Sequence, residues 1–131
     1  MQTLKIESQS KIEMIDITPE VRRVVRESEV ASGVCHIFVP HTTAALTINE
    51  NTDPSIRKDV IIELLKAVPI QPELLNAEGN AAAHIMTSLL GASEAVFVEN
   101  GKLALGTWQA IYLCEFDGPR SRTILLKVTA G

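Results

Sequence analysis

Aromatic residues, cysteines and long apolar runs are all scarce in this chain of 131 residues. Aromatic residues make up only 4% of the sequence, so a core must be built mainly from Val, Ile, Leu and Ala, within an apolar fraction of 46%. No apolar run approaches the ~20 residues of a membrane-spanning helix, and the N-terminus lacks the apolar segment of a signal peptide. We therefore expect a cytoplasmic protein with no membrane partner.

Only two cysteines are present, Cys35 and Cys114. Two are too few for a disulfide framework. Each lies inside an apolar run, which predicts that both are small buried side chains. A metal thiolate at Cys35 is the alternative.

Basic charge is also limited, because the net charge is −4 at pH 7. This balance argues against a nucleic-acid partner held by a general basic field, but it leaves room for a local basic pocket for one phosphate. The glycine-rich nucleotide motifs and the Gly-x-Ser-x-Gly elbow are absent from the sequence. Nucleotide-binding and acyl-hydrolase classes are thus not supported.

Hydrophobic periodicity predicts strands at both ends of the chain and helices between them. The length fits a single domain spanning residues 1–131. Helices are expected after caps at Thr18, Asp53 and Asn80, the first with an apolar stripe of valines and the last running over about residues 81–90. The strands are predicted at residues 4–8, 12–17, 34–39, 46–50, 95–98, 103–116 and 123–128. This order favours an α+β fold with a mixed or antiparallel sheet and about three helices.

Four features of the chain carry finer expectations. The strand at 34–39 is almost continuously apolar, so we expect both of its faces to be covered. Asn100-Gly101 predicts a tight hairpin turn. The strand at 103–116 is expected to run without interruption from that turn. The chain between residues 68 and 79 is expected to form a loop.

The histidines His41 and His84 are the first candidates for chemistry. Histidine transfers protons near neutral pH and is a common metal ligand. His41 follows a predicted buried strand and precedes Thr42 and Thr43, a setting typical of a pocket wall. The alternatives are a capped loop histidine at position 41 and a satisfied core histidine at position 84. Two histidines alone do not complete a zinc site.

A second polar group follows the strand predicted at residues 46–50. Asn49, Glu50 and Asn51 place a carboxylate between two amides. Glu50 is a candidate general base if it is buried. Asp53, directly after this group, is expected to cap a helix, although a helix N-terminus can also border an anion site.

Two further motifs are unusual. Glycine weakens a strand unless something must approach closely, so Gly106 suggests a ligand lying beside Thr107 and Gln109. The alternative is a β-bulge with Trp108 in the core. The turn Asp117-Gly118-Pro119-Arg120-Ser121-Arg122 carries two arginines, which suit a phosphate or form a solvated turn.

Four long segments resemble the YjbQ-like family, also described as secondary thiamine-phosphate synthases, and the similarity covers nearly the whole chain. They are His41-Thr42-Thr43-Ala44-Ala45-Leu46-Thr47-Ile48-Asn49-Glu50-Asn51 with Asp53-Pro54, Ala83-His84-Ile85 ahead of Ser88-Leu89-Leu90-Gly91, Ser93 to Ile111 through Gly106-Thr107-Trp108-Gln109, and Glu115-Phe116-Asp117-Gly118-Pro119-Arg120.

The resemblance implies a compact α+β homotrimer with sites near subunit boundaries. It implies a pocket that uses His41 and His84, around a divalent metal such as zinc or magnesium. It also implies a weak thiamine-phosphate synthase activity, which joins a pyrimidine diphosphate to a thiazole phosphate. On this basis His41, His84 and Glu50 are the candidate catalytic residues. The candidate ligand-binding residues are Thr42, Thr43, Asn49, Asn51, Gly106, Thr107, Gln109 and Arg120.

The chain departs from the family pattern at two positions. Leu75 stands where many members carry a histidine, and Ala82 stands where many carry an aspartate. If those groups bind metal or move protons, activity is reduced here. The departures favour an alternative hypothesis, a non-catalytic trimer that binds a small anion or metal. A purely structural trimer is the third hypothesis.

Overall fold

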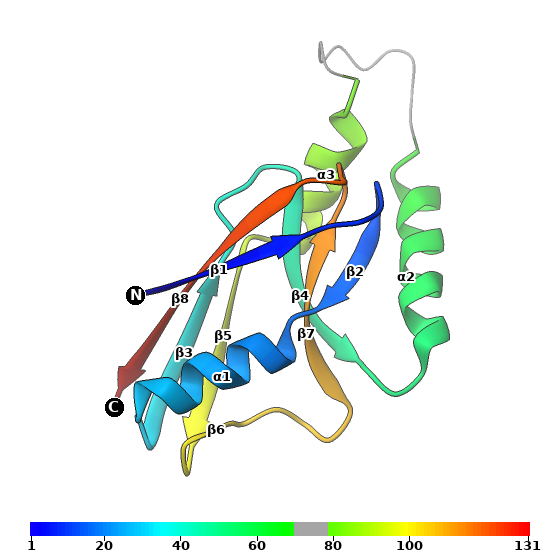
Figure 1. Cartoon of the computed structure of the whole chain (residues 1–131). Coiled ribbons are helices and arrows are strands. Elements are labelled where there is room, and N and C mark those ends of the chain that lie inside the picture. The colour runs from blue at the N-terminus through cyan, green and yellow to red at the C-terminus, as the bar shows by residue number, and fades with distance from the viewer. Residues whose placement is uncertain (70–78) are drawn as a thin grey trace.

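The structure, a computed structural model, describes residues 1–69 and 79–131, and within them eight strands and three helices follow one another along the chain (Figure 1). The helices are α1 (Thr18–Ser28), α2 (Pro54–Ala67) and α3 (Ala81–Leu90). The strands are β1 (Gln2–Glu7), β2 (Glu13–Asp16), β3 (Ser32–Phe38), β4 (Ala44–Glu50), β5 (Ser93–Glu99), β6 (Lys102–Leu103), β7 (Gln109–Glu115) and β8 (Ser121–Ala130). The loop predicted between 68 and 79 lies mostly outside the described residues.

The strands form two sheets rather than the one that was expected. A five-stranded sheet has the order β1-β8-β3-β5-β6, and a three-stranded sheet has the order β2-β7-β4. Every pair of neighbouring strands is antiparallel. The predicted α+β class with about three helices is confirmed, and of the two predicted sheet types the antiparallel one is correct.

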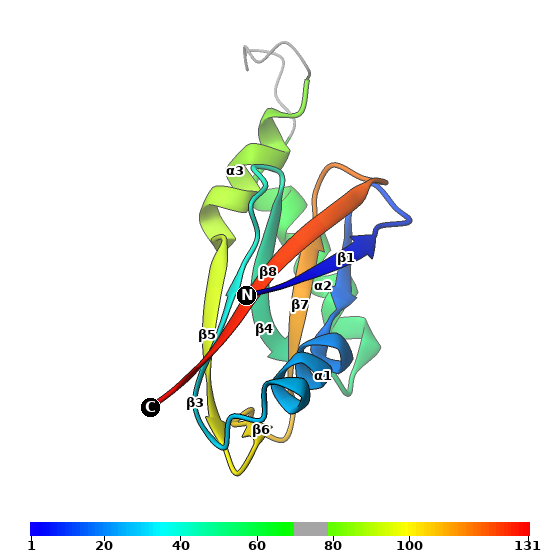
Figure 2. The ribbon, with the colours of Figure 1, turned by 60° about the vertical axis from the view of Figure 1, so that its left-hand side comes forward.

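The larger core lies between helix α1 and both sheets (Figure 2). The predicted stripe of α1 is confirmed, since Val21, Val24 and Val25 are all buried. The cap at Thr18 is wrong, because Ile17 is the N-cap and Thr18 is already helical. The Thr18 hydroxyl instead accepts a hydrogen bond from the Ile111 amide at 2.8 Å, which ties α1 to β7.

A smaller core joins α2 and α3 to the three-stranded sheet, with Ala45, Met86 and Tyr112 among its buried residues. Helix α2 begins as predicted, because the Asp53 carboxylate accepts a hydrogen bond from the Ser55 amide at 3.0 Å. Asn80 is the N-cap residue of α3, but its side chain makes no capping hydrogen bond.

Strand β3 lies at the centre of its sheet, but only one of its faces is covered. Cys35 and Ile37 are buried, whereas His36 is exposed and Phe38 is 47% exposed. On the neighbouring strand Phe97 is 70% exposed. The prediction that both faces are covered is therefore wrong for this chain, because α1 and the second sheet pack on the inner face alone.

The strand predicted over 103–116 is broken into β6 and β7. Asn100 and Gly101 form the predicted tight turn, with φ angles of 54° and 74°. After β6 the chain leaves the five-stranded sheet and crosses to the other sheet through residues 104–108. This crossing makes an unbroken strand impossible. Trp108 lies in it and is 61% exposed, so the alternative that placed Trp108 in the core is also wrong.

Both cysteines are buried, as predicted. Burial raises the pKa of the Cys35 thiol to about 11 and that of the Cys114 thiol to about 12, so both are protonated at neutral pH. In the described part of the chain, no helix is both long enough and apolar enough to cross a membrane.

Candidate functional site

His41 lies in the loop between β3 and β4, and its ring is fixed by the backbone of β8. The Thr123 amide donates a hydrogen bond to His41 Nε2 at 2.9 Å. An imidazole nitrogen that accepts a hydrogen bond carries no proton, so the proton of the neutral ring is on Nδ1. His41 is therefore placed to donate from Nδ1 rather than to act as a base at Nε2.

Beneath His41 lies a buried ion pair between Glu115 and Arg122. Arg122 is 2% exposed and Glu115 is fully buried. The Arg122 guanidinium donates from Nε and Nη2 to the two carboxylate oxygens of Glu115. Nη2 also donates to the hydroxyl and carbonyl oxygens of Thr43 at 2.9 and 3.1 Å. The Ser8 hydroxyl donates to Glu115 at 2.7 Å and completes the network.

This pair was not predicted from the sequence, because Arg122 was assigned to a solvated turn or to a phosphate site. The two-residue period of β8 carried the signal for Arg122. Arg122 lies on the same face of β8 as Ile124 and Leu126, because alternate residues of a strand share a face, and both of these residues are buried. This period places the Arg122 side chain in the core. It gives no such signal for Glu115, because residues on both faces of β7 are buried.

The network shifts two pKa values. Burial by itself raises the pKa of the Glu115 carboxyl, but hydrogen bonds from Arg122, the Asp117 amide and Ser8 outweigh it and leave the pKa lowered. The pKa of His41 is lowered by burial first and then by the positive charge of Arg122, with smaller contributions from Lys5 and Arg120 and opposition from Glu115. His41 is consequently neutral at pH 7.

The turn between β7 and β8 orients Arg120. Its Nε donates to the Asp117 carbonyl at 2.7 Å, and its Nη2 contacts the Asp117 carboxylate at 3.0 Å. The side-chain amide of Asn80 donates from Nδ2 to the same carboxylate at 2.7 Å, which joins the turn to the start of α3. A Cβ at Gly118 would collide with the Ser10 carbonyl oxygen, so this turn requires glycine.

His84 lies one turn along α3 from Asn80, and its backbone amide donates to the Asn80 carbonyl at 3.4 Å. Its side chain is half-buried and makes no hydrogen bond to any residue among 1–69 and 79–131. Thr42, in the loop beside His41, is exposed. We call the group of His41, Thr42, Thr43, Arg120 and the Glu115–Arg122 pair the histidine end. His84 lies on α3, the helix whose N-cap residue Asn80 bonds to Asp117 of the same turn.

The remaining predicted residues lie at the other end of strand β4. We call them the amide end: Asn49, Glu50, Asn51, Gly106, Thr107 and Gln109. The strand register pairs Ala44 with Glu115 at one end and Glu50 with Gln109 at the other. Six residue steps at ~3.3 Å separate Ala44 from Glu50 by roughly 20 Å. Within one chain the two ends therefore do not share a pocket.

The amide end is more open than expected. Asn49, Asn51, Thr107 and Gln109 are exposed and Glu50 is half-buried. The Gly106 amide is already engaged within the chain, because it donates a hydrogen bond to the side-chain oxygen of Gln109 at 2.8 Å. The predicted strand that placed Thr107 beside Gln109 on one face does not form here, since β7 begins only at Gln109.

The expected divalent metal finds no set of ligands in the described residues of one chain. Residues 1–69 and 79–131 contain no group of three or more His, Cys, Asp or Glu side chains that could hold an ion. His41 can bind a metal through Nδ1 only by giving up the hydrogen bond from Thr123, because its proton would then move to Nε2. Zinc or magnesium thus stays a prediction, which metal analysis of the purified protein tests.

Of the two positions that depart from the family pattern, Ala82 and Leu75, the structure describes only Ala82. Ala82 is half-buried and packs against the smaller core, so an aspartate there would require desolvation or a partner. Leu75 lies outside the described residues.

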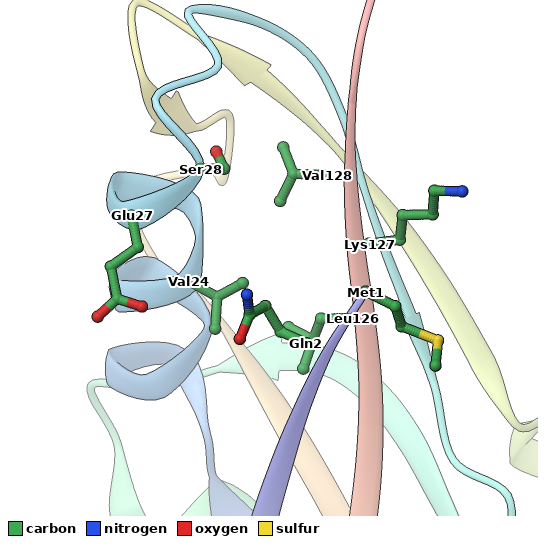
Figure 3. A pocket seen from close by; sticks show the side chains of 8 residues that line it. All are labelled: Met1, Gln2, Val24, Glu27, Ser28, Leu126, Lys127 and Val128. Atoms are coloured by element: carbon green, nitrogen blue, oxygen red, sulfur yellow. The ribbon is translucent and has the colours of Figure 1, made fainter.

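Two of the hollows on the described surface contain no predicted site residue. One, of about 180 Å³, lies between the start of β1, α1 and β8. Figure 3 shows Val24 and Val128 facing this hollow, while the Glu27 carboxylate and the Lys127 ammonium group point away from it. The charged groups of Glu27 and Lys127 therefore do not face this hollow. The other hollow, of about 360 Å³, lies between α1 and the β5–β6 hairpin.

Comparison with known proteins places the chain in a family. The model of the family described as UPF0047 protein YjbQ-like matches residues 2–131. The UPF0047 protein YugU of Bacillus subtilis is 50% identical over 129 residues, which cover 98% of each chain. A UPF0047 protein of Methanocaldococcus jannaschii is 44% identical, with 95% of this chain and 90% of that protein covered.

Solved structures agree with this assignment. A crystal structure of an uncharacterised YjbQ/UPF0047 protein from Clostridium acetobutylicum superposes with a TM-score of 0.96 at 44% identity, covering 98% of this chain and all of that one. A protein of unknown function from Sulfolobus solfataricus superposes with a TM-score of 0.94 at 32% identity, covering 99% and 96%. None of these four descriptions names a thiamine-phosphate synthase. The chain belongs to the YjbQ-like, or UPF0047, family.

Proposed function

We propose that the histidine end binds the phosphate group of a small phosphorylated molecule. The observation that carries the proposal is the state of His41. Burial and then three cationic side chains lower its pKa, against one carboxylate that raises it, and Thr123 fixes its free N–H on Nδ1. A neutral donor in a positive field suits an anion.

Arg120 supplies the second group. Asp117 holds two of its three guanidinium nitrogens, and Nη1 makes no hydrogen bond to a described residue. The side chain is half exposed, so Nη1 can reach a ligand from solvent. Arg122 is different, because Glu115 neutralises it. We assign Arg122 to positioning Thr43 and to the field around His41.

Binding is tested by isothermal titration with inorganic phosphate. Arg120→Gln is expected to weaken binding about tenfold, the effect of one charge-assisted hydrogen bond. Arg23→Gln is the matched control, because Arg23 is an exposed arginine already paired with Glu27 at 3.4 Å. Equal weakening by both variants would leave only a general charge effect.

As an enzyme, the chain would be a weak thiamine-phosphate synthase. His84, whose ring has no partner among the described residues, is then the candidate for proton transfer, and His41 is the donor to a phosphate oxygen. The test is a coupled thiamine-phosphate assay of wild type and His84→Ala. Equal product from the two proteins would remove this mechanism.

The alternative is a non-catalytic binding module. It is favoured by Ala82, which packs against the smaller core at a position where the family resemblance implies an aspartate in many members. Thermal-shift measurements with phosphates, carboxylates and divalent metals separate the two functions. Stabilisation without turnover supports binding alone.

Assembly decides whether the amide end takes part. We propose a homotrimer in which the amide end of one copy meets the histidine end of the next, and the uncovered face around Phe38 and Phe97 supports an association of this kind. Mixed trimers of His41→Ala and Gln109→Ala are then expected to regain part of the phosphate binding that each variant has lost. A monomer in sedimentation would exclude a shared site. Location in the cytoplasm stays a prediction.

A further inference from the structure

The larger hollow lies far from the histidine end. It is formed by helix α1 and the β5–β6 hairpin, at the end of the molecule opposite the β7–β8 turn (Figures 1 and 2). Its volume of about 360 Å³ falls within the range of small-molecule pockets. The described residues that line it are Arg22, Val25, Arg26, Asn100, Gly101, Lys102 and Leu103.

The charge of this hollow is of one sign. Arg22 and Arg26 are four residues apart on α1 and so share one face, and Lys102 of β6 also belongs to the lining. No carboxylate belongs to the described lining. The lining therefore carries three exposed cationic residues in a chain whose net charge is −4.

These cations are not paired within the described chain. Arg23, the neighbour of Arg22, has an ion pair with Glu27, whereas the structure shows none for Arg22, Arg26 or Lys102 within residues 1–69 and 79–131. Glu99 lies opposite Lys102 in the strand register but does not come within ion-pair distance of it. An anion in the hollow would be attracted by these unpaired positive charges.

The floor of the hollow is apolar and its rim is fixed. Val25 is 1% exposed, and Leu103 packs against the larger core. The rim carries the left-handed turn of Asn100 and Gly101, and the Gly101 amide donates to the Ala31 carbonyl at 3.0 Å. A site whose backbone is already held in place loses little entropy when it binds.

We propose that this hollow is a second anion site, specific for a phosphate monoester that carries a small apolar group. The planar guanidinium groups of Arg22 and Arg26 donate to the phosphate oxygens, and Lys102 adds a point charge. The apolar group lies against Val25 and Leu103. The site is independent of the proposed function, since it shares no residue with the histidine end.

The test is a two-dimensional NMR titration of the ¹⁵N-labelled full chain with phenyl phosphate. Shifts are expected at the amides of Asn100, Gly101, Lys102 and Leu103. Inorganic phosphate is expected to shift the same amides but to bind more weakly, because it cannot use the apolar floor. Shifts confined to Thr123 and its neighbours would mean that only the histidine end binds phosphate, and would overturn this proposal.

Variants complete the test. Arg26→Gln and Lys102→Gln are each expected to weaken phenyl phosphate about tenfold, the effect of one charge-assisted hydrogen bond. Arg23→Gln changes the same charge on the same helix outside the hollow, and is expected to leave the affinity unchanged. Equal losses of affinity for phenyl phosphate in all three variants would overturn the proposal. It would also be overturned if a poly-glutamate peptide changed the chemical shifts of the same amides and bound more tightly than phenyl phosphate.

Discussion

The two ends of strand β4 carry similar polar residues but use them differently. At the histidine end, the side chains of Thr43, Glu115 and Arg122 are buried and bonded to one another. At the amide end, Asn49, Asn51 and Gln109 are exposed. A buried polar group must be satisfied by the fold, whereas an exposed one is left available to a ligand or to another chain. The histidine end is thus expected to govern stability more than the amide end.

The largest expected effect is at Arg122. Arg122→Met leaves the Glu115 carboxylate buried without its partner, which is expected to cost about 3–5 kcal/mol of unfolding free energy. Urea denaturation measures it. Arg122→Met combined with Glu115→Leu is expected to recover most of the loss, because no unpaired charge remains. A double variant as unstable as the single one would show that packing, not charge, explains the effect.

His41 is expected to have a smaller and pH-dependent effect. His41→Ala removes the acceptor for the Thr123 amide, at a cost of about 1 kcal/mol near pH 7. The folded-state pKa of His41 lies below its ordinary 6.5, so the unfolded chain takes up the proton first as the pH falls. The stabilising contribution is therefore present above pH 6.5 and lost below it.

Denaturation curves between pH 8 and pH 5 measure this dependence, with His41→Gln as the variant that cannot titrate. Wild type is expected to lose stability relative to His41→Gln as the pH falls through this window. Glu115 gives a second loss at lower pH in both proteins, because its lowered pKa means that the unfolded chain is protonated first below 4.5. If the unfolding free energies of wild type and His41→Gln changed equally between pH 8 and pH 5, the lowered pKa of His41 would be contradicted.

The smallest expected effect is at the amide end. Gln109→Ala removes one exposed hydrogen bond to Gly106 and is expected to change the unfolding free energy by about 0.5 kcal/mol or less. Thermal denaturation measures it. A loss as large as that of His41→Ala would remove the contrast between the two ends.

Local features were predictable from the sequence. The stripe of α1, the Asp53 cap and the Asn100-Gly101 turn each depend on residues only a few positions apart. Features that depend on pairing were not. The break at 104–108 occurs because β6 and β7 belong to different sheets, and no short motif marks that change. The candidate residues themselves were named, but their division between two ends follows from the register of β4 with β7.

The amino-acid sequence alone determined the α+β class, the helix positions and the family, because periodicity, caps and long motifs are read along the chain. Tertiary structure decided that Ser8 and Glu115, 107 positions apart, share a buried network, and that His41 and Gln109 do not share a pocket. It also brought Arg22 and Lys102 to one hollow. The physical reason is that burial and charge pairing depend on distance in space, which only strand order and register establish.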